Sequence, residues 1–178
     1  MAYKVATARR TYQTHHRLEF ITITPEVELF VRESGVLNGT VTLQTHHTTC
    51  SLWVNEDEKN LIGSEDALGY VPDLQRVLDR FANPFEEYHH NDVRDAKNPD
   101  GKRHTHLCPA DENGVIQECL NGHAHAHNMI LPSYLTMIIQ NGALLRGPWQ
   151  QILLIELDHD RERTLTMLAQ GESAPMPL

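Results

Sequence analysis

Short apolar runs separated by turn signals fill the last third of the chain, and this pattern limits the possible folds more than any other feature. Asn141-Gly142 is the residue pair that two-residue β-hairpin turns favour, because both positions accept a positive φ. Residues 158–161 separate the next two runs and predict a second hairpin loop. The sequence therefore predicts strands at residues 135–140, 143–145, 151–157 and 164–169, followed by a flexible tail at residues 172–178.

Strands and helices alternate in the first half of the chain. Thr24-Pro25 is typical of a helix start and Gly35 of a helix end, so a short amphipathic helix is expected between them. Strands are expected at residues 18–23 and 40–45, with residues 51–54 continuing the second strand. A second helix is expected to begin at Val71-Pro72-Asp73 and to end near Asn83-Pro84. Apolar residues recur at helical spacing between these bounds: Leu74, Val77, Leu78 and Phe81.

These elements together predict an α+β fold, with two or three helices packed on a mixed, largely antiparallel β-sheet. A chain of 178 residues suits one domain, which we expect to span residues 1–171. Residues 86–121 show little periodicity. A loop of this length in a compact domain is often functional or mobile.

The acidic composition argues against a general nucleic-acid binder. Lys and Arg number 15 against 24 Asp and Glu, a net charge of −9, whereas such binders usually carry a basic stripe. A small phosphorylated substrate needs only a few local arginines. No apolar run approaches the roughly 20 residues of a membrane span, and the N-terminus lacks a signal-peptide core. The three cysteines (Cys50, Cys108 and Cys119) form no CxxC motif, so we expect reduced thiols in a cytoplasmic protein.

Twelve histidines, most of them in close groups, suggest a first-row metal bound through nitrogen. We expect zinc, which favours imidazole ligands. His47 ends a predicted strand, His90 follows the second helix, and His125 precedes the C-terminal hairpins. Three ligands from separate segments, with one coordination position left open, are typical of a catalytic metal site.

In an extended segment, the run His123-x-His125-x-His127 would place its three imidazoles on one face. His123 and His127 are therefore possible additional ligands. Glu56 follows an apolar strand and is a candidate general acid or base, or else a solvated turn carboxylate. Arg161 and Arg163 flank a loop and are candidates for binding a phosphate, with surface charge as the alternative.

These residues resemble the YjbQ family of secondary thiamine-phosphate synthases over roughly residues 15–171. The first part of the resemblance is Gly39 and the segment His47-Thr48-Thr49-Cys50-Ser51-Leu52-x-Val54-Asn55-Glu56, similar to the family's HTTAS-x-x-x-NE. His125 lies 24 residues before Trp149, as in the family. The remaining matches, in family order, are Asp73-Leu74, Tyr88-His89-His90, Gly142, Gly147, Trp149-Gln150, Glu156-x-Asp158, Arg161, Arg163 and Gly171.

The resemblance implies a homotrimer with metal-binding histidines near the subunit interface. It implies metal ligands at His47, His90 and His125, and polar catalytic residues at Asn55, Glu56 and Asp73. The implied reaction couples a hydroxymethylpyrimidine diphosphate to a thiazole phosphate and releases pyrophosphate. The substrate would be bound by Thr48, Thr49, Trp149, Gln150 and Arg161.

The chain also departs from the family pattern. His127 stands where the family has Lys, Tyr134 where it has Ser, and Pro148 where it has Thr or Ser. A segment at about residues 91–120 has no counterpart in the short family members, so we expect an inserted loop there. A two-residue shift of the alignment would make His127 the ligand, but the ungapped spacing to Trp149 favours His125.

Two other functions use the same residues. One is a metal-dependent hydrolase, in which the three histidines hold a water and Glu56 is the base. The other is a metal-storage or metal-sensing protein with additional sites at His104, His106, His123 and His127. Metal stoichiometry separates these classes, since an enzyme would hold one ion per chain and a storage protein several.

Overall fold

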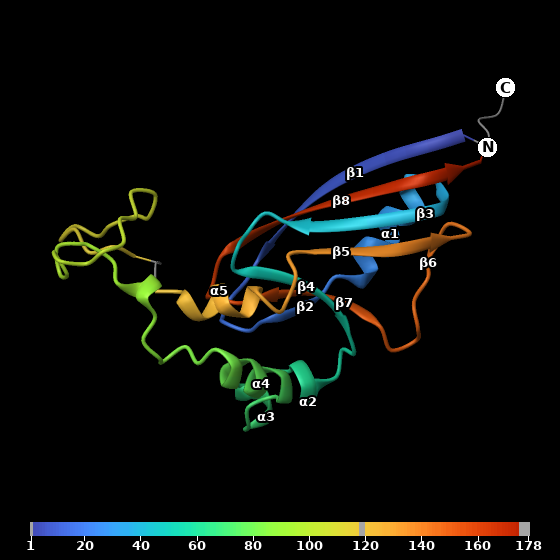
Figure 1. The fold of residues 1–178 in the computed structure, drawn as a ribbon. Helices are drawn as coiled ribbons and strands as arrows, with labels where there is room; N and C mark the ends of the chain where they lie inside the picture. Colours follow the sequence, from blue (N-terminus) through green and yellow to red (C-terminus); the bar gives the residue numbers. More distant parts are fainter. Residues whose placement is uncertain (1, 118–119, 175–178) are drawn as a thin grey trace.

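The computed structural model describes residues 2–117 and 120–174, and these residues form eight strands in two antiparallel sheets. The larger sheet has the order β1-β8-β3-β5-β6 and the smaller one β2-β7-β4 (Figure 1). The strands are β1 (Ala2–Gln13), β2 (Phe20–Thr22), β3 (Val36–Thr45), β4 (Cys50–Asn55), β5 (Tyr134–Gln140), β6 (Ala143–Leu144), β7 (Gln151–Glu156) and β8 (Glu162–Ser173).

Five α-helices and one 3₁₀ helix complete the described part of the chain. They are α1 (Thr24–Ser34), α2 (Lys59–Ile62), α3 (Glu65–Leu68), α4 (Asp73–Phe81), the 3₁₀ helix η1 (His89–Asn91) and α5 (Gly122–Asn128). The expected α+β class is confirmed. The helices outnumber the two or three expected, because α2 and α3 are single turns with their own capping residues, Glu58 and Ser64.

Strand β7 is the centre of the molecule and is buried on both faces. Ile152 and Leu154 face the first core, shared with α1 and the larger sheet. Leu153 and Ile155 face a second core, shared with the helical side through Leu78 of α4. A strand covered on both sides needs a continuous apolar run, which residues 152–155 supply. Figure 1 shows the resulting order from top to bottom: the larger sheet, the smaller sheet and helix α4.

Helix α1 forms where the sequence predicts it, but its start differs in detail. Ile23, not Thr24, occupies the position before the helix, while the buried Thr24 hydroxyl accepts a hydrogen bond from the backbone N–H of Ile152. Gly35 ends the helix in the left-handed region, with a φ of 70°. The hydrogen bond between Ile152 and Thr24 connects β7 to α1.

The N-terminal strand β1 was not expected from the sequence. It pairs along its whole length with β8, from Ala2 opposite Ser173 to Gln13 opposite Glu162. The expected flexible tail at residues 172–178 therefore begins with two residues that belong to β8, and residues 175–178 lie outside the described residues.

Two predicted connections are wrong, because the smaller sheet was not foreseen. Residues 51–54 do not continue β3, since β4 pairs with β7 in the smaller sheet. Residues 158–161 do not close a hairpin either, because β7 and β8 belong to different sheets. The hairpin at Asn141-Gly142 is confirmed: both residues have positive φ, 52° and 77°, between β5 and β6.

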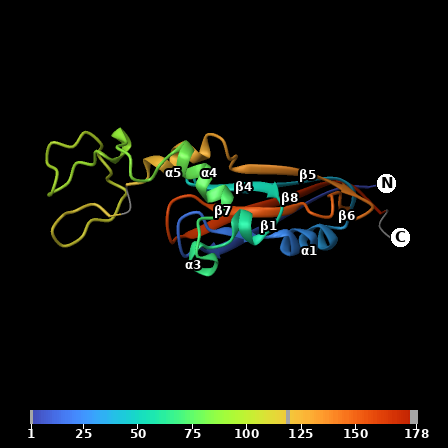
Figure 2. The ribbon, with the colours of Figure 1, turned by 90° about the horizontal axis from the view of Figure 1, so that it is seen from below.

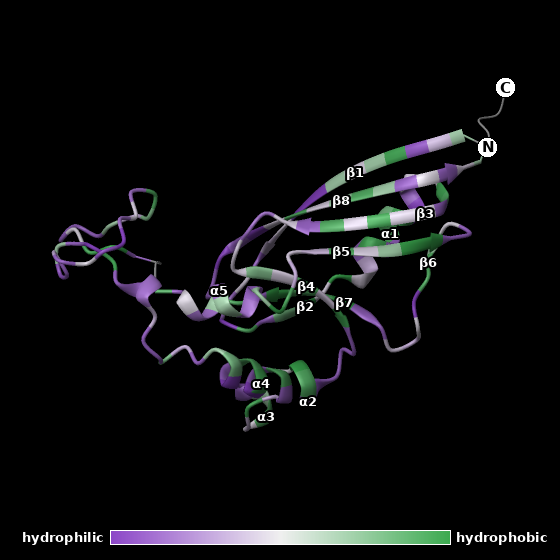
Figure 3. Cartoon of the chain, in the orientation of Figure 1, coloured by the Kyte–Doolittle hydropathy of each residue, from purple (hydrophilic) through white to green (hydrophobic). Residues whose placement is uncertain are grey.

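The described residues of segment 92–120, which are 92–117 and 120, form a long irregular arm that extends away from the sheets and helices (Figures 1 and 2). Isolated bridges, such as the one between Val93 and Arg103, are its only strand-like contacts in the described part. Side-chain hydrogen bonds stabilise its turns. For example, the Asp95 carboxylate accepts hydrogen bonds from the backbone N–H groups of Lys97 and Asn98. Figure 3 shows that hydrophilic residues alternate with shorter hydrophobic stretches along the arm. No helix in the described residues is long and apolar enough to cross a bilayer.

Candidate metal and anion site

A cavity of about 430 Å³ opens where β3, β8, α5 and the base of the arm meet. Its volume lies within the range of small-molecule sites. The three histidines predicted from separate segments all line it. The described residues around it are His46, His47, Thr48, Thr49, His90, Arg103, Cys108, Asn121, His125, Arg161 and Arg163.

His90 and His125 form the closest imidazole pair of the cavity. Their ring centroids lie 4.5 Å apart in an edge-to-face arrangement. The buried Nε2 of His90 has no hydrogen-bond partner in the described residues. A ring bonded to zinc through nitrogen has its centroid about 3.2 Å from the ion, so two rings that share an ion lie at most about 6.4 Å apart. The pair therefore fits a shared metal ion.

His47 lines the same cavity but its ring is held differently. The backbone N–H of Thr164 donates to its Nε2 at a distance of 2.8 Å. A neutral imidazole that accepts at Nε2 carries its proton on Nδ1. His47 can therefore become a ligand only after its ring gives up this bond or loses the Nδ1 proton. In line with this, no three His, Cys, Asp or Glu side chains of the described residues are arranged as a ready metal site.

Burial and positive charge keep these imidazoles neutral. Burial lowers the pKa of His90 and of His125, and the guanidinium of Arg103 lowers both pKa values further. Burial also lowers the pKa of His47, followed by the charge of Arg163. A neutral imidazole keeps a lone pair on one ring nitrogen, which a metal ligand needs.

Three arginines and no carboxylate line the cavity among the described residues. Arg161 pairs with the buried Asp158 at 2.8 Å, and Arg163 pairs with the buried Glu156. Arg103 donates to the backbone carbonyl of His90 at 2.6 Å. Guanidinium groups match the geometry of phosphate oxygens, so the lining suits an anionic ligand.

Asp158 and Asn121 join the arginine side of the cavity to the histidine side. The Asn121 amide donates to Asp158 at 3.0 Å, and the Asn121 side chain is near enough to His90 to partly offset the lowering of that imidazole's pKa by burial. Sequence reasoning did not select Asn121 or Arg103 as site residues. Their position beside the cavity depends on the fold of the arm and α5, and neither residue belongs to a motif that marks it in advance.

The other predicted site residues divide into two groups. Thr48, Thr49 and Arg161 line the cavity. The remaining five do not line it in this chain: Asn55 and Glu56 at the far end of β4, Asp73 at the start of α4, and Trp149 and Gln150 before β7.

The bonds of these five residues are local. Asn55 accepts from the backbone N–H of Glu56, and Asp73 pairs with Arg76 at 2.7 Å on the surface. Gln150 accepts from the N–H of Gly147. Within one chain, Glu56 is thus not positioned as the base of a hydrolase acting in the cavity.

The His-x-His-x-His segment is helical, so the shared face that an extended segment would give its three imidazoles does not form. It forms α5, so His123 and His127, four residues apart, share one face. That face is buried, whereas His125 lies on the cavity side. The structure therefore separates His125 from His127, and the cavity contains His125 alone of the three.

The expectation of reduced cysteines is also corrected in part. Cys108, which lines the cavity, is disulfide-bonded, whereas Cys50 is a buried free thiol. Cys119 lies outside the described residues.

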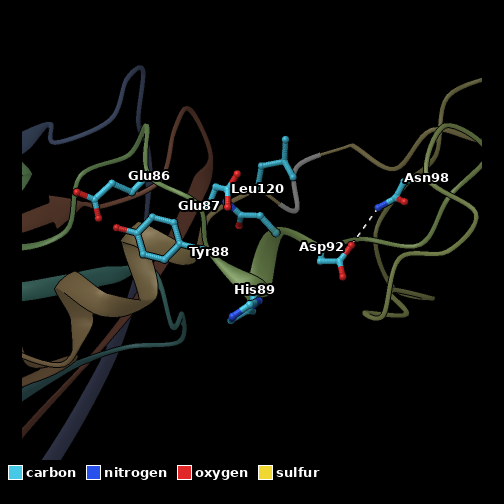
Figure 4. A pocket seen from close by; sticks show the side chains of 8 residues that line it. Glu86, Glu87, Tyr88, His89, Asp92, Asn98 and Leu120 are labelled. Atoms are coloured by element: carbon cyan, nitrogen blue, oxygen red, sulfur yellow. Dashed lines mark hydrogen bonds between the residues drawn. The ribbon is translucent and has the colours of Figure 1, made fainter.

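A larger hollow of about 550 Å³ lies beside the site on the arm side. Figure 4 shows Glu86, Glu87 and Asp92 among its side chains, with Asn98 donating to Asp92. Its carboxylates would repel a phosphate. The arginine-lined cavity is therefore the better candidate for an anionic substrate.

Comparison with known proteins gives a consistent family assignment. A family model described as "UPF0047 protein YjbQ-like" matches residues 8–172. A UPF0047 protein from Methanothermobacter thermautotrophicus is 24% identical over 169 residues, covering 95% of this chain and 94% of that protein. The UPF0047 protein YugU of Bacillus subtilis is 28% identical over 160 residues, covering 89% of this chain and 95% of that protein.

Solved structures agree with these relatives. A YbjQ-like protein of unknown function from Sulfolobus solfataricus P2 matches with a TM-score of 0.74 and 27% identity, over 96% of this chain and all of that one. A hypothetical protein from Aeropyrum pernix K1 matches with a TM-score of 0.69 and 27% identity, over 94% of this chain and 99% of that one.

Proposed function

The chain belongs to the YjbQ-like UPF0047 family, and from this premise we propose that it is a metal-binding enzyme that acts on a small phosphorylated substrate in the arginine-lined cavity. One observation carries the proposal. The neutral imidazoles of His90 and His125 lie 4.5 Å apart in a cavity whose described charged lining is made of arginines. The two candidate metal ligands and the candidate anion-binding arginines thus line the same cavity.

The reaction that we propose is thiamine-phosphate synthesis. The ring nitrogen of a thiazole phosphate forms a bond to the methylene carbon of a hydroxymethylpyrimidine diphosphate. The carbon–oxygen bond of the diphosphate breaks, and pyrophosphate leaves with the electron pair. Negative charge therefore grows on the leaving group, so catalysis needs positive charge placed around it.

The described residues suit this requirement. Arg103 and Arg161 reach the cavity from the arm and from the β7–β8 connection, and their partners hold the guanidinium groups in place before substrate arrives. The hydroxyls of Thr48 and Thr49 are further donors at the same wall. A divalent ion, which we propose is zinc, would be held by His90 and His125, with His47 as the third candidate, and would supply Lewis-acid charge to the phosphate oxygens.

We also propose that the protein is a cytoplasmic homotrimer. The outer face of the larger sheet exposes several large apolar side chains. Val5 and Ile138 lie in the same row of paired residues across the sheet, and Tyr3 and Tyr134 lie in other rows of that face. Exposed apolar surface of this kind typically marks an interface. Asn55, Glu56 and Asp73, which do not line the cavity in their own chain, would then act only from a neighbouring subunit. Size-exclusion chromatography with light scattering tests the assembly, and a monomer mass would contradict it.

The metal proposal is tested by metal content after dialysis against zinc. His90→Ala and His125→Ala should each lose most of the cavity-bound metal while keeping the fold, and His89→Ala is the matched control, since His89 is exposed beside His90. Thiamine phosphate, measured by mass spectrometry from the two purified substrates, should form with the wild type and the control only. Unchanged metal content in both variants would overturn the ligand assignment, and absence of product with metal bound would overturn the reaction.

A further inference from the structure

The connection between β7 and β8 supplies Arg161 to the cavity, and the backbone of this residue is fixed on both sides. The backbone N–H of Thr14 donates to the carbonyl of Arg161 at 2.8 Å. The Thr14 hydroxyl accepts from the N–H of Arg161 at 2.9 Å, and Thr14 itself is fully buried. Arg161 therefore starts from a defined backbone position, and the orientation of its guanidinium depends on side-chain contacts.

The guanidinium of Arg161 has two acceptors on one terminal nitrogen. Its Nη2 lies 2.8 Å from Oδ2 of Asp158 and 2.8 Å from Nε2 of His159. A guanidinium can only donate, so Nε2 of His159 is the acceptor in this contact. A planar group held by one hydrogen bond can still rotate about it, whereas two acceptors in different directions fix its plane.

The other contacts of His159 require the same state of its ring. Its Nδ1 lies 3.1 Å from the carbonyl oxygen of Asp160 and 3.2 Å from the carboxylate of that residue. A carbonyl and an ionised carboxylate only accept, so Nδ1 carries the ring proton and Nε2 keeps its lone pair. The charged groups that face the ring are Arg161, Asp160 and Asp158, whose Oδ1 lies 4.0 Å from Nε2. The neutral imidazole thus satisfies both of its nitrogens.

His159 has no direct place in the cavity. Its side chain is 36% exposed, and it does not belong to the cavity lining, whereas Arg161 does. Asp158 cannot hold the guanidinium in the same way by itself, because its Oδ2 also accepts from the amide of Asn121 at 3.0 Å. Any effect of His159 on a ligand in the cavity must therefore pass through Arg161.

We propose that His159 is a positioning residue for the anion site, an inference that rests on the proposed binding of a phosphorylated substrate in the cavity. Its neutral imidazole holds the guanidinium plane of Arg161, so that this group meets phosphate oxygens in one orientation. A guanidinium binds phosphate most strongly through two parallel N–H···O bonds, which depend on that orientation. Because an oriented side chain loses less conformational entropy on binding, His159 raises the affinity for the anion without contacting it.

The test is a calorimetric titration with inorganic pyrophosphate at about pH 8, where imidazoles are neutral. His159→Leu removes the ring nitrogens, and His159→Gln restores an acceptor of comparable reach. His159→Leu is also made in an Arg161→Ala background. His16→Leu is the control, because His16 is an exposed histidine that does not line the cavity. Thermal unfolding establishes that each variant is folded.

We expect His159→Leu to weaken pyrophosphate binding roughly three- to tenfold, the usual effect of one lost hydrogen bond. His159→Gln and His16→Leu should stay within about twofold of the wild type, since one keeps the acceptor and the other leaves the site unchanged. In the Arg161→Ala background, His159→Leu should have no further effect, because the group that His159 positions is gone.

Three results would each overturn the positioning role and leave the anion cavity in place. They are wild-type affinity in His159→Leu, equal weakening in His159→Leu and His159→Gln, and an undiminished effect of His159→Leu in the absence of the Arg161 guanidinium. Absence of pyrophosphate binding by the wild type would instead overturn the proposed function of the cavity, and this inference with it.

Discussion

Glu156 and Arg163 form a bidentate ion pair in the interior, with side-chain exposures of 0% and 3%. Glu156 ends β7 and Arg163 lies in β8, so the pair joins the two sheets. The Thr14 hydroxyl and the backbone N–H of Asp158 also donate to Glu156. Arg163 in turn donates to Thr49 in the cavity wall.

Glu156→Gln should destabilise the protein strongly, because it leaves the buried guanidinium of Arg163 without a counter-charge. Breaking one partner of such a pair typically costs about 3–5 kcal/mol of unfolding free energy. Urea denaturation followed by circular dichroism measures the change. Arg76→Ala, which breaks the exposed pair with Asp73, is the control and should change stability by less than about 1 kcal/mol. Equal effects in the two variants would contradict the structural role of the buried pair.

The sequence predicts well those elements whose signal is local. The turn at Asn141-Gly142 depends on two residues that accept positive φ, and α1 depends on the apolar spacing of Val27, Phe30 and Val31. Helix α4 is also found at residues 73–81, but its apolar face is only partly covered. Val77 and Phe81 remain 54% and 50% exposed, which the spacing alone does not reveal.

Other features depend on contacts between distant segments. Alternating histidine in residues 123–127 suggests a strand, but α5 forms because its buried face packs beside Leu78 and Leu153. Strand β1 has little apolar alternation, and its pairing with β8 positions it. The sequence does select His47, His90 and His125 as residues that share a site region. It contains no signal for Asn121 or for the partners that hold the arginines.

Gly39→Ala should weaken the pairing of β3 with β8. Gly39 lies opposite Gly171, and a Cβ on Gly39 would lie 2.0 Å from the carbonyl oxygen of Gln170, so the strands would have to separate. Forcing atoms into a packed interior typically costs about 1–3 kcal/mol. Gly69→Ala is the control, because its Cβ would meet open space and only its φ of 74° is strained, at about 1 kcal/mol. Thermal unfolding compares the two, and a smaller loss for Gly39→Ala than for the control would contradict the close approach.

Cys50 should resist alkylation in the folded protein. Burial raises the pKa of its thiol to about 12. Since the thiolate is the reactive form, only about one thiol in ten thousand is ionised at about pH 8. Iodoacetamide labelling with peptide mass spectrometry should therefore show modification of Cys50 in urea but almost none without it. Equal labelling of folded and unfolded protein at this position would contradict the buried environment.

Arg103→Ala should weaken the binding of an anion to the cavity. Arg103 is part-buried at the cavity wall and reaches it from the arm, where its guanidinium bonds to the carbonyl of His90. A charge-assisted hydrogen bond contributes on the order of 1.5–3 kcal/mol, so affinity for inorganic pyrophosphate should fall roughly tenfold or more. Lys102→Ala is the matched control, because Lys102 is exposed next to Arg103 and does not line the cavity. It removes the same net charge from the same segment. Calorimetric titration with pyrophosphate measures the affinity, and Lys102→Ala should bind pyrophosphate nearly as tightly as the wild type. Equal weakening in both variants would mean that the overall charge of the protein, and not Arg103 at the cavity, attracts the anion.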